Sequence, residues 1–291
     1  MTKILITGAS GKLGRLVINH LLESQNMAAA DIVAASRNPS GLADLTAKGI
    51  ETRRADFTDP ASLDQAFSGI DRLLIISTDA IGSRIEQHKT AIAAAAKAKV
   101  SRIFYTSMPN PETSKILFAP EHAQTEQAIK ASGLAYTILR NNWYMENLFM
   151  ALPSAFAGGQ WHTSAGEGKT AYIAREDIAR AIASALAKPV AENIVYTISG
   201  SRAYSNREIA ALAEKATGNP LAVVDITDQQ LEDGMVAAGV PKPVAPVFAS
   251  IDTAIRAGDL DVITDDAQSL SGRPLLSLEA FIEANKTSLV G

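Results

Sequence analysis

The sequence predicts an α/β protein: a doubly wound parallel sheet followed by a smaller, mostly helical C-terminal lobe. Two observations lead to this prediction. In the first half, short apolar runs alternate with longer segments that have the periodicity of helices. Beyond residue 141 the alternation loosens into longer helical segments with one clear strand. Strands joined by helix-length crossovers form a parallel sheet covered on both faces, so we expect three layers in the first half.

The elements follow in order along the chain. Strands are expected at 3–7, 31–36, 51–55, 71–77, 102–107 and 135–140, with helices at 11–24, 40–48, 60–68, 83–98 and 119–131. Asp59 as N-cap and Pro60 at the first helical position begin the third helix. Later helices are expected at 176–187, 206–216, 228–239 and 277–285, with a strand at 193–199. We therefore expect a first domain over residues 1–145 and a lobe over 146–291, part of which returns to the sheet.

Composition limits the classes of partner. The chain has 291 residues, of which 47% are apolar, and a net charge of −4 without blocks of like charge. This balance argues against nucleic acid or an anionic membrane as a partner, so we expect small molecules and allow a homodimer. No apolar run approaches the ~20 residues of a membrane span, and Gly8 interrupts the first run too early for a signal peptide. The absence of cysteine excludes disulfides and thiolate metal sites and fits a cytoplasmic location.

The stretch "ITGASGKLG" (6–14) carries the strongest functional signal. A strand that ends at Thr7, a glycine turn and a helix from about Gly11 bring free N–H groups and the positive end of a helix dipole to one point, which binds phosphate. The glycines permit the turn, the approach of a pyrophosphate and close packing of helix on strand. The alternative is tight packing without a ligand. The predicted cofactor-binding loop consists of Gly8, Ala9, Ser10, Gly11, Lys12, Leu13 and Gly14.

A second glycine-rich stretch, "TSAGEGKT" (163–170), ends like a Walker A loop. Its first required glycine is replaced by Thr163, so a nucleotide triphosphatase is not expected.

The end of the second expected strand indicates which dinucleotide binds. A site for NAD usually has an acidic residue there, whereas this chain has "SRNP". Arg37 can pair with a 2′-phosphate and Lys12 can add a second charge, so NADPH is favoured over NADH. The alternative for Arg37 is a solvated loop residue. Asp56 and Phe57, after the third strand, are candidates to accept from the adenine amino group and to cover its ring, although Asp56 is equally suited to an ordinary turn.

A family resemblance now becomes specific. "ITGASGKLG", "SRNP", "ADFTDP", "LLIIS", "YTS" and "YTILRNNWYMEN" occur in the order and spacing of the NmrA-like atypical short-chain dehydrogenases, which the chain resembles over almost its whole length. The resemblance implies a Rossmann domain with a small substrate lobe, NADPH without a flavin or a metal, and reduction of quinones or similar conjugated acceptors. It also implies that Asn141, Asn142 and Trp143 lie near the nicotinamide and that Tyr144 faces the acceptor.

Ordinary short-chain dehydrogenases use a tyrosine with a lysine four residues later, in which lysine lowers the pKa of the proton-donating tyrosine. None of the six tyrosines here has lysine at that distance. Tyr136 and Arg140 come closest, but they lie on an expected strand where their side chains cannot form a helical pair. The helix that should carry the pair has His122 and Glu126 instead, and Ser107 alone remains in place.

This absence favours an acceptor that needs no strong acid. Hydride addition to a quinone gives a phenolate-like anion with a pKa near ~10, unlike the alkoxide from a ketone. Ser77, Thr78, Ser107 and the loop from Asn141 to Tyr144 are the candidates to line the acceptor pocket, and Ser107, Tyr144 and His122 are the candidate catalytic residues.

Alternatives remain for these candidates. Trp143 and Tyr144 could instead be core residues between the lobe and the sheet. His122 could donate a proton or hold nearby backbone, and we favour the second interpretation because no orienting partner is visible in the sequence. His122 and Glu126 lack a third ligand at a recognisable spacing, so no metal site is predicted.

Three functions are compatible with these features. An NADPH-dependent reductase of quinone-like acceptors is favoured because every cofactor feature is intact. An NADPH-binding sensor that regulates a partner protein would also explain the loss of the tyrosine and lysine. A nucleotide-sugar epimerase shares the fold but needs that pair, so it ranks below the other two.

Overall fold

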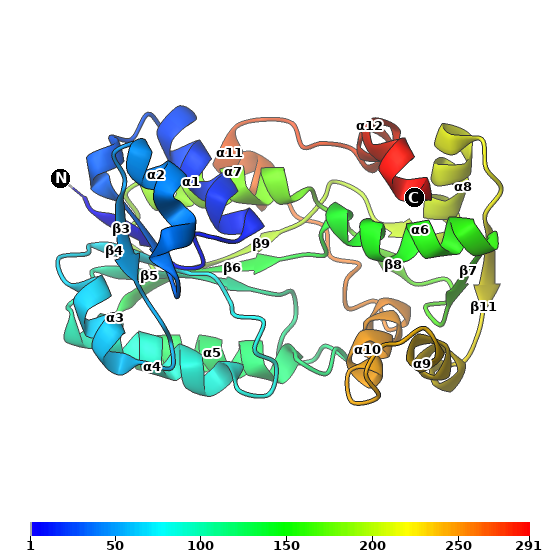
Figure 1. The fold of residues 1–291 in the computed structure, drawn as a ribbon, viewed down its shortest axis with the longest axis horizontal. Helices are drawn as coiled ribbons and strands as arrows, with labels where there is room; N and C mark the ends of the chain where they lie inside the picture. The colour runs from blue at the N-terminus through cyan, green and yellow to red at the C-terminus, as the bar shows by residue number, and fades with distance from the viewer. Residues whose placement is uncertain (1) are drawn as a thin grey trace.

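Seven parallel strands form the central sheet of the computed structural model, which describes residues 2–291 (Figure 1). Their order is β3-β2-β1-β4-β5-β6-β9. The register is continuous, since Leu5 of β1 pairs with Val33 on one side and Leu73 on the other. The strands are β1 (Ile4–Ile6), β2 (Ile32–Ser36), β3 (Glu51–Arg54), β4 (Arg72–Ile75), β5 (Arg102–Ser107), β6 (Ala135–Asn141) and β9 (Ile194–Ile198). The predicted doubly wound parallel sheet is confirmed.

Helices cover both faces of this sheet (Figure 1). The upper layer in the figure contains α1 (Lys12–Glu23), α2 (Ala43–Ala47), α7 (Arg175–Ala187) and α11 (Asp266–Ser271), and the lower layer contains α3 (Pro60–Phe67), α4 (Arg84–Lys97) and α5 (Ala119–Ala131). Side chains alternate along each strand, so Ile4 and Ile6 enter one core and Leu5 enters the other. Both faces of β1, β2 and β4 are therefore buried, which explains the nearly continuous apolar character of these strands.

Local signals set the helix boundaries well, with one exception. Asp59 Oδ1 accepts from the Ser62 N–H at 3.2 Å, which confirms the predicted cap of α3. The predicted helix at 40–48 is wrong in extent, because Pro39–Leu42 form a short 3-10 turn (η2) before the five-residue α2. Asn38 caps that turn by accepting from the Ser40 N–H at 3.1 Å. Two further 3-10 turns are η1 (Ala29–Asp31) and η3 (Met145–Asn147).

The chain returns to the sheet after it has entered the lobe. β9 pairs with β6 along five residues, from Thr137 opposite Ile194 to Asn141 opposite Ile198. The preceding helix, α7, packs against α1 through the core that contains Val17, Ile18, Ile178 and Ile182. Residues from both halves of the sequence thus build one sheet and its upper helical layer.

The lobe, at the right of Figure 1, contains more strand than the sequence predicted. The expectation of a single strand after residue 141 is wrong, because four short strands form two small sheets. β7 (Gln160–Thr163) pairs with β11 (Ala222–Asp225) in parallel, and β8 (Lys169–Thr170) pairs with β10 (Tyr204–Ser205) in antiparallel. Strands of two to four residues carry too few positions for a period-2 pattern to stand out.

Two helices of the lobe were also missed. The full set is α6 (Leu148–Gly158), α8 (Asn206–Thr217), α9 (Asp228–Ala237), α10 (Ala245–Arg256) and α12 (Leu278–Val290). α6 is apolar around most of its surface and contains Pro153, so it shows no helical period and has a residue that normally interrupts helices. α10 begins at the end of the proline-rich stretch "VPKPVAP" (240–246), with Pro246 in its first turn. No helix of residues 2–291 is long and apolar enough to cross a membrane.

Candidate functional site

The glycine loop lies at the end of β1, where the strand order reverses between β1 and β4. Gly8 has φ +62°, which side chains rarely permit, and its carbonyl accepts from the Gly11 N–H at 2.9 Å. A Cβ on Gly14 would lie 2.4 Å from that same Gly8 oxygen, so only glycine lets α1 approach the turn this closely. Ligands of doubly wound sheets bind at such a reversal point.

The start of α1 is suited to an anion. Gly11 is its N-cap and, within the described chain, no side chain caps it and no acidic residue stands in its first turn. Its first N–H groups and the dipole therefore remain available to a phosphate. Ser10 Oγ lies 3.2 Å from Ser36 Oγ, which joins this loop to the end of β2. These features fit the pyrophosphate of a dinucleotide.

Arg37 follows β2 beside this loop. Its guanidinium is exposed and has no ion-pair partner among residues 2–291, and the same holds for Lys12. Asp56 accepts from the Thr58 N–H at 3.0 Å and from its hydroxyl at 2.7 Å, and these bonds lower the pKa of the carboxyl, with Arg37 contributing a smaller effect. The Asp56 carboxylate therefore stabilises the turn, and Arg37 lies near enough to interact electrostatically with it.

Phe57 is buried, with its ring edge-on to His88 at a centroid distance of 6.2 Å. Its ring forms part of the core beneath α3 and α4, so a role in covering adenine stays a prediction.

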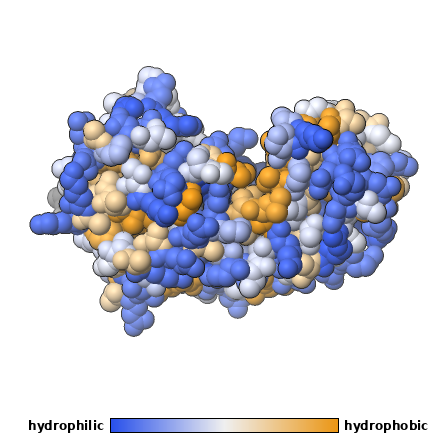
Figure 2. Space-filling model, turned by 90° about the horizontal axis from the view of Figure 1, so that it is seen from below, coloured by the Kyte–Doolittle hydropathy of each residue, from blue (hydrophilic) through white to orange (hydrophobic). Residues whose placement is uncertain are grey.

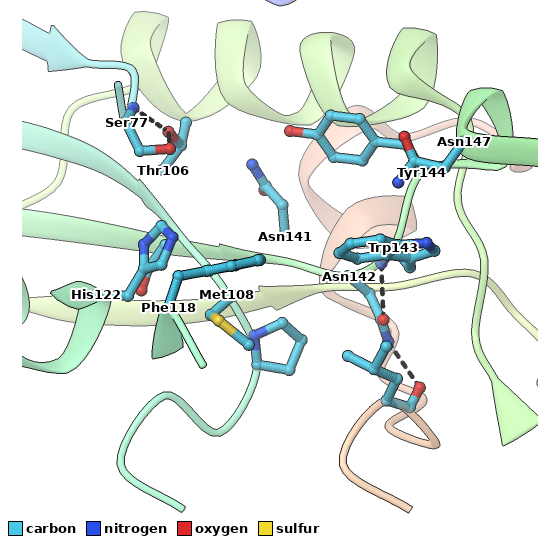
Figure 3. A pocket seen from close by; sticks show the side chains of 13 residues that line it. Ser77, Thr106, Met108, Phe118, His122, Asn141, Asn142, Trp143, Tyr144 and Asn147 are labelled. Carbon is cyan, nitrogen blue, oxygen red and sulfur yellow. Dashed lines mark hydrogen bonds between the residues drawn. The ribbon is translucent and has the colours of Figure 1, made fainter. Parts of the chain in front are cut away.

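A cavity of about 190 Å³ opens at the carboxyl ends of β4, β5 and β6 (Figure 3). The predicted residues Ser77, Ser107 and His122 line it together with the whole loop from Asn141 to Tyr144. Sequence segments 77, 107 and 141–144 thus meet because neighbouring parallel strands end at one edge of the sheet. Thr106, Met108, Pro109, Phe118, Asn147 and Leu260 complete the lining. We call this space the acceptor cavity.

Asn141 and Tyr144 present polar atoms to the acceptor cavity (Figure 3). The Asn141 side chain is buried, and neither its amide nitrogen nor its oxygen has a hydrogen-bond partner in the described structure. An unpaired buried amide is costly unless a ligand completes it. Burial raises the pKa of Tyr144. Tyr144 therefore stays protonated and can donate a hydrogen bond.

Asn142 has a different role from its neighbour. Its amide nitrogen donates to the carbonyls of Leu260 (3.1 Å) and Val262 (3.3 Å), and its oxygen accepts from the Trp143 N–H at 2.7 Å. Figure 3 shows two of the hydrogen bonds that hold this side chain. Asn142 thus ties the loop to the segment after α10 and leaves the Trp143 ring at the cavity edge.

Ser107 is committed to an internal partner. Its hydroxyl donates to Glu126 Oε1 at 2.7 Å, and Glu126 is ion-paired with Arg140 at 2.7 Å. The position where a short-chain dehydrogenase would carry lysine therefore holds a buried carboxylate that is neutralised from β6. Because the single hydroxyl hydrogen of Ser107 points to Glu126, this residue offers the cavity lone pairs rather than a proton. Its catalytic role stays a prediction.

His122 also has partners that the sequence did not reveal. The Arg84 guanidinium, which can only donate, lies 3.1 Å from His122 Nε2, and Tyr105 Oη lies 2.8 Å from Nδ1. The hydrogen of the neutral ring therefore stands on Nδ1. Burial and the nearby Arg84 hold the pKa of His122 well below its usual value. These contacts favour the structural interpretation of His122 over that of a proton donor.

His88 is a second buried histidine whose two ring nitrogens both have hydrogen-bond partners. Its Nε2 accepts from the Thr78 N–H at 3.2 Å, so Nδ1 donates to Thr125 Oγ1 at 3.0 Å. Burial, aided by Arg84, lowers its pKa to about 3. Thr78 Oγ1 is itself buried without a partner in the described chain. Thr78 and Ser77 are thus held by backbone contacts, Ser77 through its N–H to Thr106 Oγ1 at 2.9 Å.

These two neutral histidines predict acid-sensitive folding. Both have pKa values below the ~6.5 of the unfolded chain, so the unfolded state takes up protons first as the pH falls. Their contribution is complete above pH ~6.5 and is lost progressively below it, by up to about 1.4 kcal/mol per pH unit for each histidine. Urea unfolding at pH 7.5 and 5.0 should show a lower free energy of unfolding at pH 5.0. His88→Gln should make the free energy of unfolding less dependent on pH. Equal stability at both pH values would contradict the burial of neutral rings.

Residues that sequence reasoning missed are Tyr105, Arg84 and Arg140. In the sequence Arg140 was considered only as a replacement for the missing lysine. A charged residue inside an expected strand indicates a buried partner of opposite charge, which here is Glu126. No group of three potential metal ligands occurs among residues 2–291.

Comparison with known proteins places the chain in a family and supports its fold. The model of the NmrA-like family matches residues 1–269. Quinone oxidoreductase 2 of Escherichia coli is 36% identical over 278 residues, which cover 94% of this chain and 96% of that protein. The structure of the NADPH-dependent quinone oxidoreductase from Escherichia coli complexed with NADPH superposes with a TM-score of 0.93 at 35% identity, over 97% of this chain and 99% of that chain. The Citrobacter sp. triphenylmethane reductase complexed with NADP(H) gives 0.90 at 33% identity, with the same coverage.

Proposed function

The chain belongs to the NmrA-like family, and on that basis we propose that it is an NADPH-dependent oxidoreductase that transfers hydride to a quinone or a similar conjugated acceptor. One observation carries the proposal. The acceptor cavity combines aromatic rings with an unpaired buried amide and has no tyrosine and lysine pair, and a glycine loop suited to a dinucleotide lies at the same carboxyl edge of the sheet. The relatives with the same architecture are named for quinone and triphenylmethane reduction.

NADPH, when bound, supplies the hydride. In this proposal the glycine loop and the start of α1 hold its pyrophosphate, and Arg37 with Lys12 holds its 2′-phosphate. The unpaired Asn141 amide gains partners from the nicotinamide or from the acceptor.

The chain's own groups align the acceptor and receive its charge. A flat quinone ring packs against Trp143 and Tyr144, which favour offset or edge contacts. Hydride adds to the quinone and the electron pair moves to the carbonyl oxygen, which gives a hydroquinone anion. The Asn141 amide and the Tyr144 hydroxyl donate hydrogen bonds to this developing anion, which then takes a proton from water. Because the anion is phenolate-like, no side chain with a lowered pKa is required.

Asn141→Ala tests the amide. We expect kcat/KM for a naphthoquinone to fall about fivefold, the effect of one neutral hydrogen bond of ~1 kcal/mol. The Asn141→Asp variant should show a larger fall in kcat/KM, because an ionised aspartate only accepts hydrogen bonds. Initial rates of NADPH oxidation measure both variants. An unchanged rate in Asn141→Ala would remove this residue from the site.

The direct test mixes the purified protein with NADPH and follows the nicotinamide absorbance with and without 2-methyl-1,4-naphthoquinone. Enzyme-dependent loss of absorbance is expected. If the protein binds NADPH but does not oxidise it with any quinone-like acceptor, it would be a sensor instead. The named activities of its relatives do not favour that outcome. In the proposal the reductase works in the cytoplasm, close to a supply of NADPH. A homodimer stays a prediction, since one chain supplies every residue named in the site.

A further inference from the structure

A second, larger cavity lies in the lobe between α6, β7, α9 and α10. Its volume is about 810 Å³, within the ~300–1,000 Å³ that is typical of small-molecule sites. Trp143 and Asn147 line both this space and the acceptor cavity, so the two meet at the loop after β6. The proposed mechanism does not use this second space, which we call the side chamber.

The walls of the side chamber are largely apolar. None of its described lining residues is a lysine or an arginine. Its one carboxylate, Asp252, accepts from Thr163 Oγ1 at 2.6 Å and from the Ser164 N–H at 2.8 Å, so it is already engaged. An anionic ligand would find no cationic partner here. The apolar lining includes Leu148, Trp161, Ile226, Ile251 and Ile255.

The outer wall is poorly covered. α9 contains no buried residue, although Leu231 and Met235, one turn apart, both line the chamber. Met150 is 67% exposed and Phe248 is 42% exposed. On the face seen in Figure 2, apolar side chains gather near the middle of the molecule, beside a notch between its two halves. A ligand that covers Met150 and Phe248 would remove apolar surface from water, which is favourable.

We propose that the side chamber binds a long apolar substituent, an alkyl or isoprenoid chain, of an uncharged quinone whose ring occupies the acceptor cavity. This inference rests on the proposed function and specifies its substrate class. Trp143 and Asn147 line both spaces, so the two lie next to each other, as a single molecule that occupies both requires. The apolar, cation-free lining selects a hydrocarbon chain over an acidic side chain.

Intrinsic fluorescence can report binding without turnover, because the chain has two tryptophans and both line the side chamber. The probes are 2-methyl-1,4-naphthoquinone and the same ring with a ten-carbon alkyl chain, titrated without NADPH below the concentration at which the longer probe aggregates. We expect the long-chain probe to bind at least tenfold more tightly, because each buried methylene adds to affinity. In turnover with NADPH, its KM should be lower by a similar factor.

Gly234→Phe fills the chamber from α9. A Cβ at Gly234 would meet nothing within 4 Å. Glycine also has a low helix propensity, so the fold should tolerate its replacement within α9. The matched control is Gly158→Phe, at a helical glycine of α6 that also meets nothing within 4 Å and lies outside the chamber lining. We expect Gly234→Phe to reduce the tenfold preference for the long-chain probe to near one, and Gly158→Phe to retain it. Ala151→Phe, from the opposite wall, is a second filling variant.

Equal affinity of the wild-type protein for the two probes would overturn the inference, as would an equal loss of preference in Gly234→Phe and Gly158→Phe. Failure of the proposed function gives a different result. If the long-chain probe binds tightly and in a Gly234-dependent way but NADPH is not consumed, the reductase proposal fails while the chamber remains a site for apolar ligands.

Discussion

Gly11→Val is expected to weaken NADPH binding by more than about 100-fold while the protein stays folded. The new side chain would stand at the uncapped start of α1, over the N–H groups that we assign to the pyrophosphate. Each hydrogen bond to a charged group is worth ~1.5–3 kcal/mol, so the loss of even one or two gives an effect of this size. The fold should survive because a Cβ at Gly11 meets one atom, the Gly8 carbonyl oxygen, at 3.2 Å. Titration of NADPH by fluorescence, with circular dichroism for folding, measures both quantities.

Two other glycines provide the comparison for this experiment. Gly14→Val should destabilise the protein itself, because its Cβ would lie 2.4 Å from the Gly8 carbonyl oxygen. Gly158→Val, in the lobe, should leave NADPH binding as it is. Normal NADPH affinity in a folded Gly11→Val protein would show that the cofactor does not bind at this loop.

Arg37→Asp is expected to raise KM for NADPH by about 10- to 100-fold and to improve the use of NADH. The guanidinium is exposed and has no ion-pair partner within the described residues, so it is free to meet a 2′-phosphate. A charge-assisted hydrogen bond of ~1.5–3 kcal/mol sets the size of the loss, and aspartate can accept from the ribose 2′-hydroxyl of NADH instead. Steady-state kinetics with both cofactors give the ratio of kcat/KM. The NADPH effect should shrink at high salt.

Arg54→Gln is the matched control, because its guanidinium lies nearby on β3 but is already paired with Asp59 at 2.5 Å. It should keep the preference for NADPH. If Arg37→Asp and Arg54→Gln behave alike, Arg37 is the solvated loop residue that the sequence also allowed.

The sequence predicted the sheet better than the lobe. Strands β1, β2, β4 and β5 are almost wholly buried, and crossovers of helix length separate the strands of the sheet, so composition and length together identify them. In the lobe, β7 and β11 have four residues each, and α6 is apolar around most of its surface, so neither gives a period that a single sequence can reveal. The pairing of β7 with β11, about 60 residues apart, depends on packing.

By itself, the sequence determined the features that lie within one short segment. The glycine loop, the arginine after β2 and the missing tyrosine and lysine pair each depend on local spacing, and local spacing is sufficient for a turn, a helix start or a helical pair. Only the tertiary structure decided which of two adjacent side chains faces the cavity and which one makes structural hydrogen bonds. Asn141 faces the cavity unpaired, while Asn142 is held by Leu260, 118 residues away. His122 takes its tautomer from Arg84, 38 residues away. Hydrogen bonds between segments distant in the chain exist only after packing, so no local pattern encodes them.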